Sequence, residues 1–184
     1  MLSALLVSAF ATQPGLAYPL RVVLMIGVVG FFWQFMRQIP WRLDPVAILV
    51  GAAIGVMWVA IPVAEAETAP YGELTGVLLL GWFVARGLGT IVLVPLIEEL
   101  FFRDYLERRL RFGTGMAWRL LAAIITAGLF AALHDRWVEA FIAGLAFSYV
   151  MSRSDRVGDA VLSHAVANAL VFGAAVATGN LAMI

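Results

Sequence analysis

The sequence predicts an all-α protein: a polytopic bundle of transmembrane helices with about six spans and a short apolar segment at its N-terminus. Hydrophobic residues make up 63% of the 184 residues and charged residues 13%, whereas soluble domains carry roughly 45–50% apolar and about 25% charged residues. The apolar residues form runs separated by short breaks that are polar or contain Gly and Pro. A surplus of this size cannot be hidden in one water-soluble core, so we expect a single integral-membrane domain over residues 1–184.

Six apolar segments predict the spans in order along the chain. They cover residues 20–36, 45–63, 75–110, 117–134, 138–152 and 158–180. The third segment exceeds the roughly 20 residues that one span needs, and Gly87, Gly89 and Pro95 lie near its middle. We therefore expect this helix to kink or restart at residues 87–95 and to continue from Glu98 to Arg111.

The N-terminal stretch, residues 1–11, is apolar but only about half as long as a span. No basic flank precedes its apolar run, which disfavours a cleaved signal peptide. We expect either an interfacial helix or the remnant of a longer first span, followed by the turn-like residues 12–19.

The charges in the breaks predict the orientation of the bundle. All 12 basic residues are arginines. Three arginine-rich breaks fall on alternate sides of the predicted bundle: Arg37 with Arg42, then Arg103, Arg108, Arg109 and Arg111, then Arg153 with Arg156. The break that holds Glu65, Glu67 and Glu73 carries no basic residue. By the positive-inside bias, we expect the arginine-rich breaks to face the cytoplasm.

Net charge and cysteine content exclude several classes of function. The formal net charge is zero and the chain contains no cysteine. A nucleic-acid partner requires a basic field, so none is expected. Without cysteine the chain cannot form disulfides, use a thiolate nucleophile or bind a metal through sulfur.

Two adjacent carboxylates, Glu98 and Glu99, lie within the third apolar segment. A charge in a membrane segment costs about 2.5–3.5 kcal/mol on insertion scales, so such residues are functional candidates. Glu99 and Arg103 are four residues apart, share one helical face and can form an ion pair. Glu98 points about 100° away from Glu99 and has no basic residue three or four positions away. We therefore predict a structural pair of Glu99 with Arg103 and a functional role for Glu98.

The chain has two histidines, and both lie in apolar helical context. His134 follows Phe130 by one turn, and His164 precedes Asn168 by one turn, so that imidazole and carboxamide lie side by side. Each could be a satisfied core residue, but polar groups on three helices in hydrocarbon need partners, which predicts that they meet. Counted from the turn between their helices, the depths of Glu98 and His134 differ by only about 6 Å, so the two could meet across an antiparallel pair.

Three short motifs occur in order: Glu-Glu-x-x-x-Arg at 98–103, Phe-x-x-x-His at 130–134 and His-x-x-x-Asn at 164–168. Together they resemble the CAAX protease and bacteriocin-processing family of intramembrane endopeptidases, over roughly residues 90–172. The stretch Tyr-Pro-Leu-Arg at 18–21 is similar to the bacterial branch associated with exosortase protein sorting. The resemblance implies an integral protein of the bacterial inner (cytoplasmic) membrane that cleaves a membrane-associated peptide or protein.

The same resemblance implies a glutamate-type protease without a cofactor or metal. The implied catalytic residues are Glu98, His134, His164 and Asn168, and the implied supporting residues are Glu99, Arg103 and Phe130. The first glutamate and the first histidine would orient and deprotonate a water. The second histidine and the asparagine would donate hydrogen bonds to the oxyanion of the tetrahedral intermediate.

Two other interpretations of these residues stay open. Glu98, His134 and His164 could ligate zinc with one open position, although the chain has no His-Glu-x-x-His motif and Asn168 is a poor zinc ligand. Alternatively, the polar groups could serve a non-enzymatic membrane scaffold, an immunity protein or a transporter. In every case the lipid bilayer is an expected partner.

Overall fold

The computed structural model describes residues 11, 13, 15–64 and 69–184, and every regular element within them is helical. This confirms the all-α prediction. The elements are α2 (Tyr18–Phe31), α3 (Trp33–Met36), α4 (Pro45–Ala60), α5 (Gly76–Leu88), η1 (Gly89–Leu93), α6 (Val94–Glu99), η2 (Leu100–Glu107), α7 (Met116–Ala131), α8 (Trp137–Ser154), α9 (Val157–Thr178) and η3 (Leu181–Met183). Residues 1–10 of the predicted N-terminal segment lie outside the described residues.

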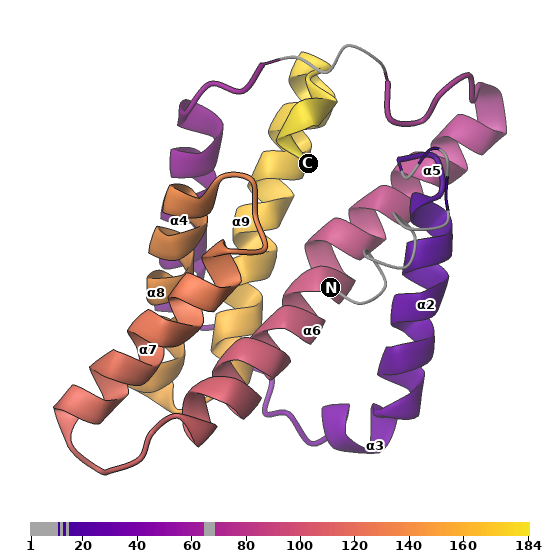
Figure 1. Cartoon of the computed structure of the whole chain (residues 1–184). Helices are drawn as coiled ribbons and strands as arrows, with labels where there is room; N and C mark the ends of the chain where they lie inside the picture. The colour runs from indigo at the N-terminus through magenta and orange to yellow at the C-terminus, as the bar shows by residue number, and fades with distance from the viewer. Residues whose placement is uncertain (1–10, 12, 14, 65–68) are drawn as a thin grey trace.

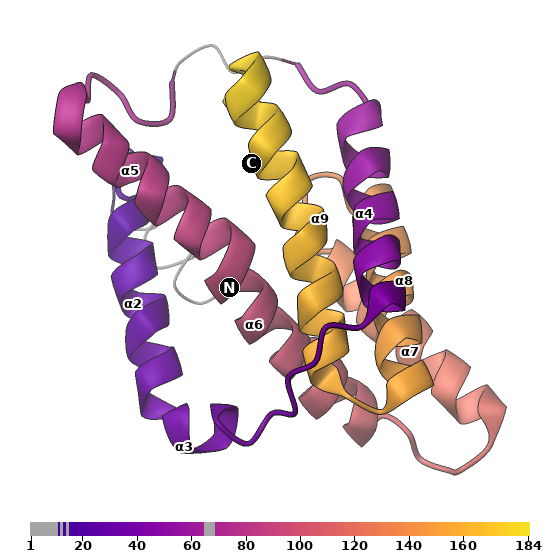
Figure 2. The ribbon, with the colours of Figure 1, turned by 180° about the vertical axis from the view of Figure 1, so that it is seen from behind.

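One long helix, Gly76–Glu107, crosses the middle of the molecule through α5, η1, α6 and η2. Figures 1 and 2 show α2 beside α5 on one side of it, while α9, α4 and α8 lie on the other side. Helix α9 packs against η1 and α6, α4 packs against α9, and α7 pairs with α8. Helix α9 is therefore held between α4 and the long helix.

The predicted interruption at residues 87–95 is a change of helical winding rather than a break. Gly89–Leu93 is π-helical, and the N–H of Val94 bonds to the carbonyl five residues back. The next donor in that register would be Pro95, which has no N–H. The carbonyl of Thr90 therefore loses its backbone partner, while the flanking residues keep right-handed helical backbone angles and the helix continues.

The predicted six spans are not confirmed. Among the described residues, two helices are long and apolar enough to cross a membrane, Gly76–Glu107 and Val157–Thr178. Helices α2, α4 and α7 are apolar but have only 10–17 residues. The apolar segments of the sequence are longer than these helices because they include apolar residues of the adjoining turns. The segment 117–134, for example, continues three residues beyond the end of α7 at Ala131.

The distribution of side chains suits a lipid environment. Large apolar side chains face outward, and Phe31 is 83% and Val77 80% exposed. Several charged side chains lie inside, among them Glu99 and Arg103, which are both 0% exposed. In a water-soluble domain, large apolar side chains are mostly buried and charges are seldom fully buried unless they are paired.

Two glycines set the close contact between α4 and α9. Gly51 and Gly55 are one turn apart, the spacing of small residues that lets membrane helices approach closely. A Cβ atom at Gly51 would lie 2.2 Å from the backbone oxygen of Ser163, and one at Gly55 would lie 3.0 Å from the backbone oxygen of Ala167. These two contacts bracket His164, so α4 fixes the segment of α9 that carries the second histidine.

The start of α4 is also anchored to the turn between α8 and α9. Asp44 accepts hydrogen bonds from the N–H groups of Val46 and Ala47 and forms ion pairs with Arg153 and Arg156. Burial acts to raise the pKa of the Asp44 carboxyl, but the hydrogen bonds from Arg153 and from the two N–H groups outweigh it, so the pKa lies below its usual value. The cap therefore stays charged near neutral pH.

We expect Gly51→Ala to lower the stability of the purified protein by about 1–3 kcal/mol, because the added methyl group overpacks against backbone that cannot rotate away. Thermal unfolding in detergent measures the change. Gly173→Ala on α9 is the matched control, since a Cβ there meets nothing within 4 Å. Equal melting temperatures for the two variants would show that the close contact of α4 with α9 does not limit stability.

Candidate active site

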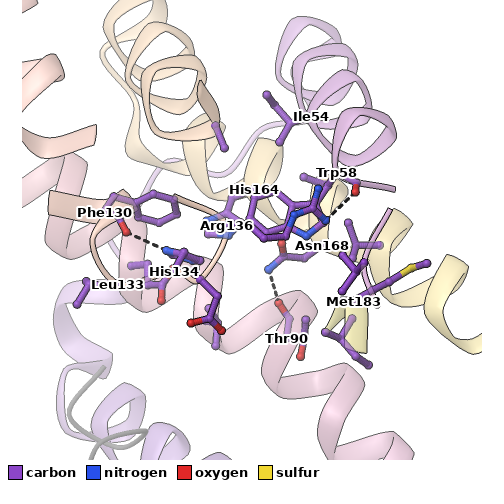
Figure 3. Close-up of a pocket in the computed structure, with 18 of the residues that line it drawn as sticks. Ile54, Trp58, Thr90, Phe130, Leu133, His134, Arg136, His164, Asn168 and Met183 are labelled. Atoms are coloured by element: carbon purple, nitrogen blue, oxygen red, sulfur yellow. Dashed lines mark hydrogen bonds between the residues drawn. The ribbon is translucent and has the colours of Figure 1, made fainter. Parts of the chain in front are cut away.

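A cavity of about 580 Å³ is lined by residues from α2, α4, the long helix and α7 to α9. Glu98, His134, His164 and Asn168 all line it, and so does Phe130. Figure 3 shows His134, His164 and Asn168 around this space. The structure therefore brings the four sequence-predicted catalytic residues to one cavity, whose volume lies in the range of small-molecule sites.

Glu98 lies at the end of α6 and is 8% exposed. Its Oε2 atom is buried and receives no hydrogen bond. A buried carboxylate oxygen normally has a donor, and leaving it without one is costly. Glu98 is thus a carboxylate at the cavity wall that can still accept a proton or a hydrogen bond.

Glu99 does not line the cavity and lies between a guanidinium group and an imidazole. Its Oε2 is 3.2 Å from Nε of Arg103, which is the predicted ion pair. Its Oε1 is 2.8 Å from Nδ1 of His164, a contact that the sequence did not predict. Arg103 in turn donates from Nη2 to the carbonyl of Gly144 on α8, at 2.9 Å. The cluster joins the long helix to α8 and to α9.

Arg103 fits against α8 because residue 144 is a glycine. A Cβ atom there would lie 3.1 Å from Nη2 of Arg103 and 3.0 Å from Cα of Ala127 on α7. The guanidinium carbon of Arg103 also lies 4.8 Å from the centre of the Phe130 ring. Arg103 thus contacts both α8 and the ring of Phe130.

His134 lies in the turn after α7 rather than within the helix, because α7 ends at Ala131. Its Nδ1 is 2.8 Å from the carbonyl oxygen of Phe130, which also accepts from the N–H of Leu133 at 3.2 Å. A carbonyl can only accept, so Nδ1 carries the proton. In the neutral ring, Nε2 is then the nitrogen with the free lone pair.

Aromatic rings hold both imidazoles. The ring of Phe147 stacks on His164, with centroids 4.7 Å apart and planes 15° apart. The ring of Phe130 lies 4.5 Å from that of His134 and 5.8 Å from that of His164. Trp58 approaches His134 edge-on at 6.4 Å. Packing on these faces limits the rotation of the two imidazoles.

Asn168 supplies the hydrogen bond that Pro95 cannot. Its Nδ2 donates to the carbonyl of Thr90 at 2.8 Å (Figure 3), the carbonyl that the π-helical register leaves without a backbone donor. In a membrane, freed backbone groups must find such partners. One N–H of the Asn168 amide is therefore structural, and the second remains for another acceptor.

Sequence reasoning missed several lining residues. Arg21 and Arg86 line the cavity beside Tyr18, and Arg136 lines it near Trp58. The argument that intramembrane charges are functional candidates would have identified Arg86, which lies in an apolar segment, had it been applied to cations as well as to carboxylates.

The zinc alternative requires Glu98, His134 and His164 to form one ligand set. In the part of the chain that the structure describes, no three His, Cys, Asp or Glu side chains are grouped so that they could hold a metal ion. Nδ1 of each imidazole is already hydrogen-bonded, to the Phe130 carbonyl and to Glu99. The three residues share a cavity without forming a ligand cluster.

Comparison with known proteins gives one result. A protein-family model described as "type II CAAX prenyl endopeptidase Rce1-like" matches residues 80–170. This range contains all three motifs and every sequence-predicted site residue. No curated protein and no solved structure matches the chain.

Proposed function

We propose that this chain, which belongs to the Rce1-like family of type II CAAX prenyl endopeptidases, hydrolyses a peptide bond within the membrane by activating water with Glu98 and His134. The family match confirms the resemblance that the three motifs indicated. The family is one of membrane proteases. The residues, the glutamate-type mechanism and the location in a bacterial inner membrane are our proposal.

One observation carries the proposal. Glu98 has a buried oxygen without a hydrogen-bond donor, in a cavity that it shares with His134, His164 and Asn168. A general base must have an available lone pair within reach of a water, and both Glu98 Oε2 and Nε2 of neutral His134 have one. The other carboxylate of the motif, Glu99, does not line the cavity and lies against Arg103 and His164.

In the proposed reaction, a water attacks the scissile carbonyl carbon while its proton passes to Glu98. The carbonyl bond opens to an oxyanion, and a tetrahedral intermediate forms. The proton then moves to the amide nitrogen, the C–N bond breaks, and an amine and a carboxylic acid are released. His134 orients the water through Nε2, because its Nδ1 proton is held by the Phe130 carbonyl.

His164 and Asn168 would stabilise the oxyanion. The Glu99 carboxylate accepts from Nδ1 of His164, so Nε2 can donate as well only when the ring is an imidazolium. The second N–H of Asn168, not used by Thr90, would be the other donor. Donors preorganised in a dry site commonly contribute about 2.7–4 kcal/mol each to transition-state binding.

We expect Glu98→Gln to lower kcat by about 10²–10⁴, because it removes a general base while keeping the shape of the side chain. Mass spectrometry of membrane peptides from cells with wild type or Glu98→Gln identifies the substrate, and turnover of the purified proteins gives kcat. The matched control is Glu107→Gln. Glu107 is buried on the same long helix, is bonded to Arg111 and Ser148, and does not line the cavity.

The control should lower the melting temperature and leave turnover per folded molecule near the wild-type value. Glu98→Gln should leave the melting temperature nearly unchanged. A Glu98→Gln protein that cleaves as fast as wild type would refute the assignment and favour a non-enzymatic role.

A second experiment separates the two roles of Asn168. Asn168→Ala should lower stability by about 1–3 kcal/mol, because the Thr90 carbonyl is left without a donor, and should also lower kcat by about 10²–10³. Adding Pro95→Ala restores a backbone N–H, so the double variant should regain melting temperature but not turnover. Recovery of both properties together would remove Asn168 from the oxyanion site.

We expect Glu99→Gln to lower kcat less than Glu98→Gln and to lower the melting temperature more. The amide can still accept from His164 Nδ1, but it no longer compensates the buried Arg103, and breaking a buried pair costs about 3–5 kcal/mol. Melting temperature and turnover are measured on one preparation. A larger loss of kcat at Glu99 than at Glu98, with stability unchanged, would mean that Glu99 is the catalytic carboxylate.

A further inference from the structure

Two arginines of the cavity wall converge on one aromatic ring. The guanidinium carbons of Arg21, on α2, and Arg86, in the last turn of α5, lie 5.5 and 4.1 Å from the centre of the Tyr18 ring. Both side chains line the cavity. The Nε atom of each is buried and makes no hydrogen bond.

This pair differs from the other arginines at the site. Arg136 is bonded to Glu139 at 2.9 Å, and Arg103 is paired with Glu99 at 3.2 Å. Neither Arg21 nor Arg86 forms an ion pair with any acidic side chain among the described residues. Among the described residues, carboxylates thus pair with Arg136 and Arg103 but with neither Arg21 nor Arg86.

Two like charges held together in a region of low dielectric repel each other, and each is costly to bury. The face of the Tyr18 ring attracts a cation and offsets part of this cost, but it supplies no full negative charge. An anion bound between the guanidinium groups would supply it. Guanidinium is well suited to this because its planar donors bind both oxygens of a carboxylate.

The pair is connected to the proposed oxyanion donor by two hydrogen bonds. The hydroxyl of Tyr18 is 3.2 Å from Oγ1 of Thr90, and the carbonyl of Thr90 accepts from Asn168 at 2.8 Å. Figure 3 shows the second of these bonds. An anion on Arg21 and Arg86 would therefore lie in the same cavity as the reacting bond, on the side of η1.

Gly89 makes this arrangement possible. A Cβ atom at residue 89 would lie 2.5 Å from the hydroxyl oxygen of Tyr18, so a larger residue would push Tyr18 away from Thr90. Because Gly89 has no side chain, the ring of Tyr18, which both guanidinium groups contact, packs directly on the π-helical turn.

We propose that Arg21 and Arg86 bind a carboxylate of the peptide substrate and thereby select which peptide bond reaches Glu98. This proposal rests on the proposed function. The carboxylate is either the C-terminal one or an acidic side chain. A peptide carboxylate fits better than a lipid headgroup, because the pair lines the same cavity as Glu98 and Asn168.

The test uses the full-length protein in phosphatidylcholine vesicles with a degenerate library of short apolar peptides. The library is made with a C-terminal carboxylate or a C-terminal amide, each with Glu or Gln at one internal position. Mass spectrometry gives relative kcat/KM values. Wild type should prefer one carboxylate-bearing form over its neutral counterpart by about 10- to 100-fold, the ratio expected for a hydrogen bond to a charged group.

Arg21→Gln and Arg86→Gln should bring that ratio close to one, mainly through a higher KM for the carboxylate form. Arg86→Lys keeps the charge but not the planar fork, so it should retain part of the preference. Arg119→Gln, an exposed position on α7, should leave the ratio at the wild-type value. A wild type without preference, or a preference that survives in both Gln variants, would refute the proposal.

Binding to the inactive Glu98→Gln protein separates this proposal from the proposed function. The carboxylate library should raise its melting temperature more than the neutral library, and Arg86→Gln in the same background should abolish the difference. If cleavage fails but this difference is present, the catalytic assignment is wrong and the anion site stands. If phosphatidylglycerol in the vesicles, rather than peptide carboxylate, stabilises wild type and not the arginine variants, the site is a lipid site and the proposal is refuted.

Discussion

The buried carboxylate of Glu99 is the contact on which the geometry of the site depends. It lies between Arg103 on its own helix and His164 on α9, and Arg103 continues to the carbonyl of Gly144 on α8. A charge with no solvent exposure is tolerated only when its partners are in place. The long helix, α8 and α9 can therefore shift against one another only by breaking this cluster. The position of the second histidine follows from it.

Backbone that departs from regular α-helix is used here to place side chains. Pro95 removes the donor for the Thr90 carbonyl, and Asn168 of α9 replaces it. The same π-helical turn begins at Gly89, where Tyr18 approaches closely. In a regular helix the Thr90 carbonyl would accept from a backbone N–H and would not need a carboxamide donor from α9. The irregular turn thus joins α2 and α9 across the cavity.

Contacts between residues one turn apart were predictable, and contacts between distant segments were not. Helical periodicity correctly gave the Glu99–Arg103 pair, because both residues lie on one helix. Nothing in the spacing indicated that Glu99 also reaches His164, 65 positions away. The partner of Asn168 is a backbone carbonyl. Every residue type has one, so the sequence does not mark the position of this partner. Pro95 was the available signal, since a proline inside an apolar helix frees a carbonyl that some side chain must satisfy.

Glu98 and Glu99 are chemically identical neighbours whose surroundings differ. One step along the helix turns their side chains about 100° apart, so Glu99 enters the packed interior and Glu98 reaches the cavity wall. Glu99 lies between Arg103 and His164, and these contacts hold its carboxylate in place. Glu98 lines the cavity, and its Oε2 has no donor, so it can accept a hydrogen bond from a molecule in the cavity. A general base must be able to exchange a proton during turnover, and a carboxylate committed to an arginine and a histidine cannot do so without breaking its contacts. The two adjacent glutamates thus have different surroundings, and Glu98 is the one that lines the cavity.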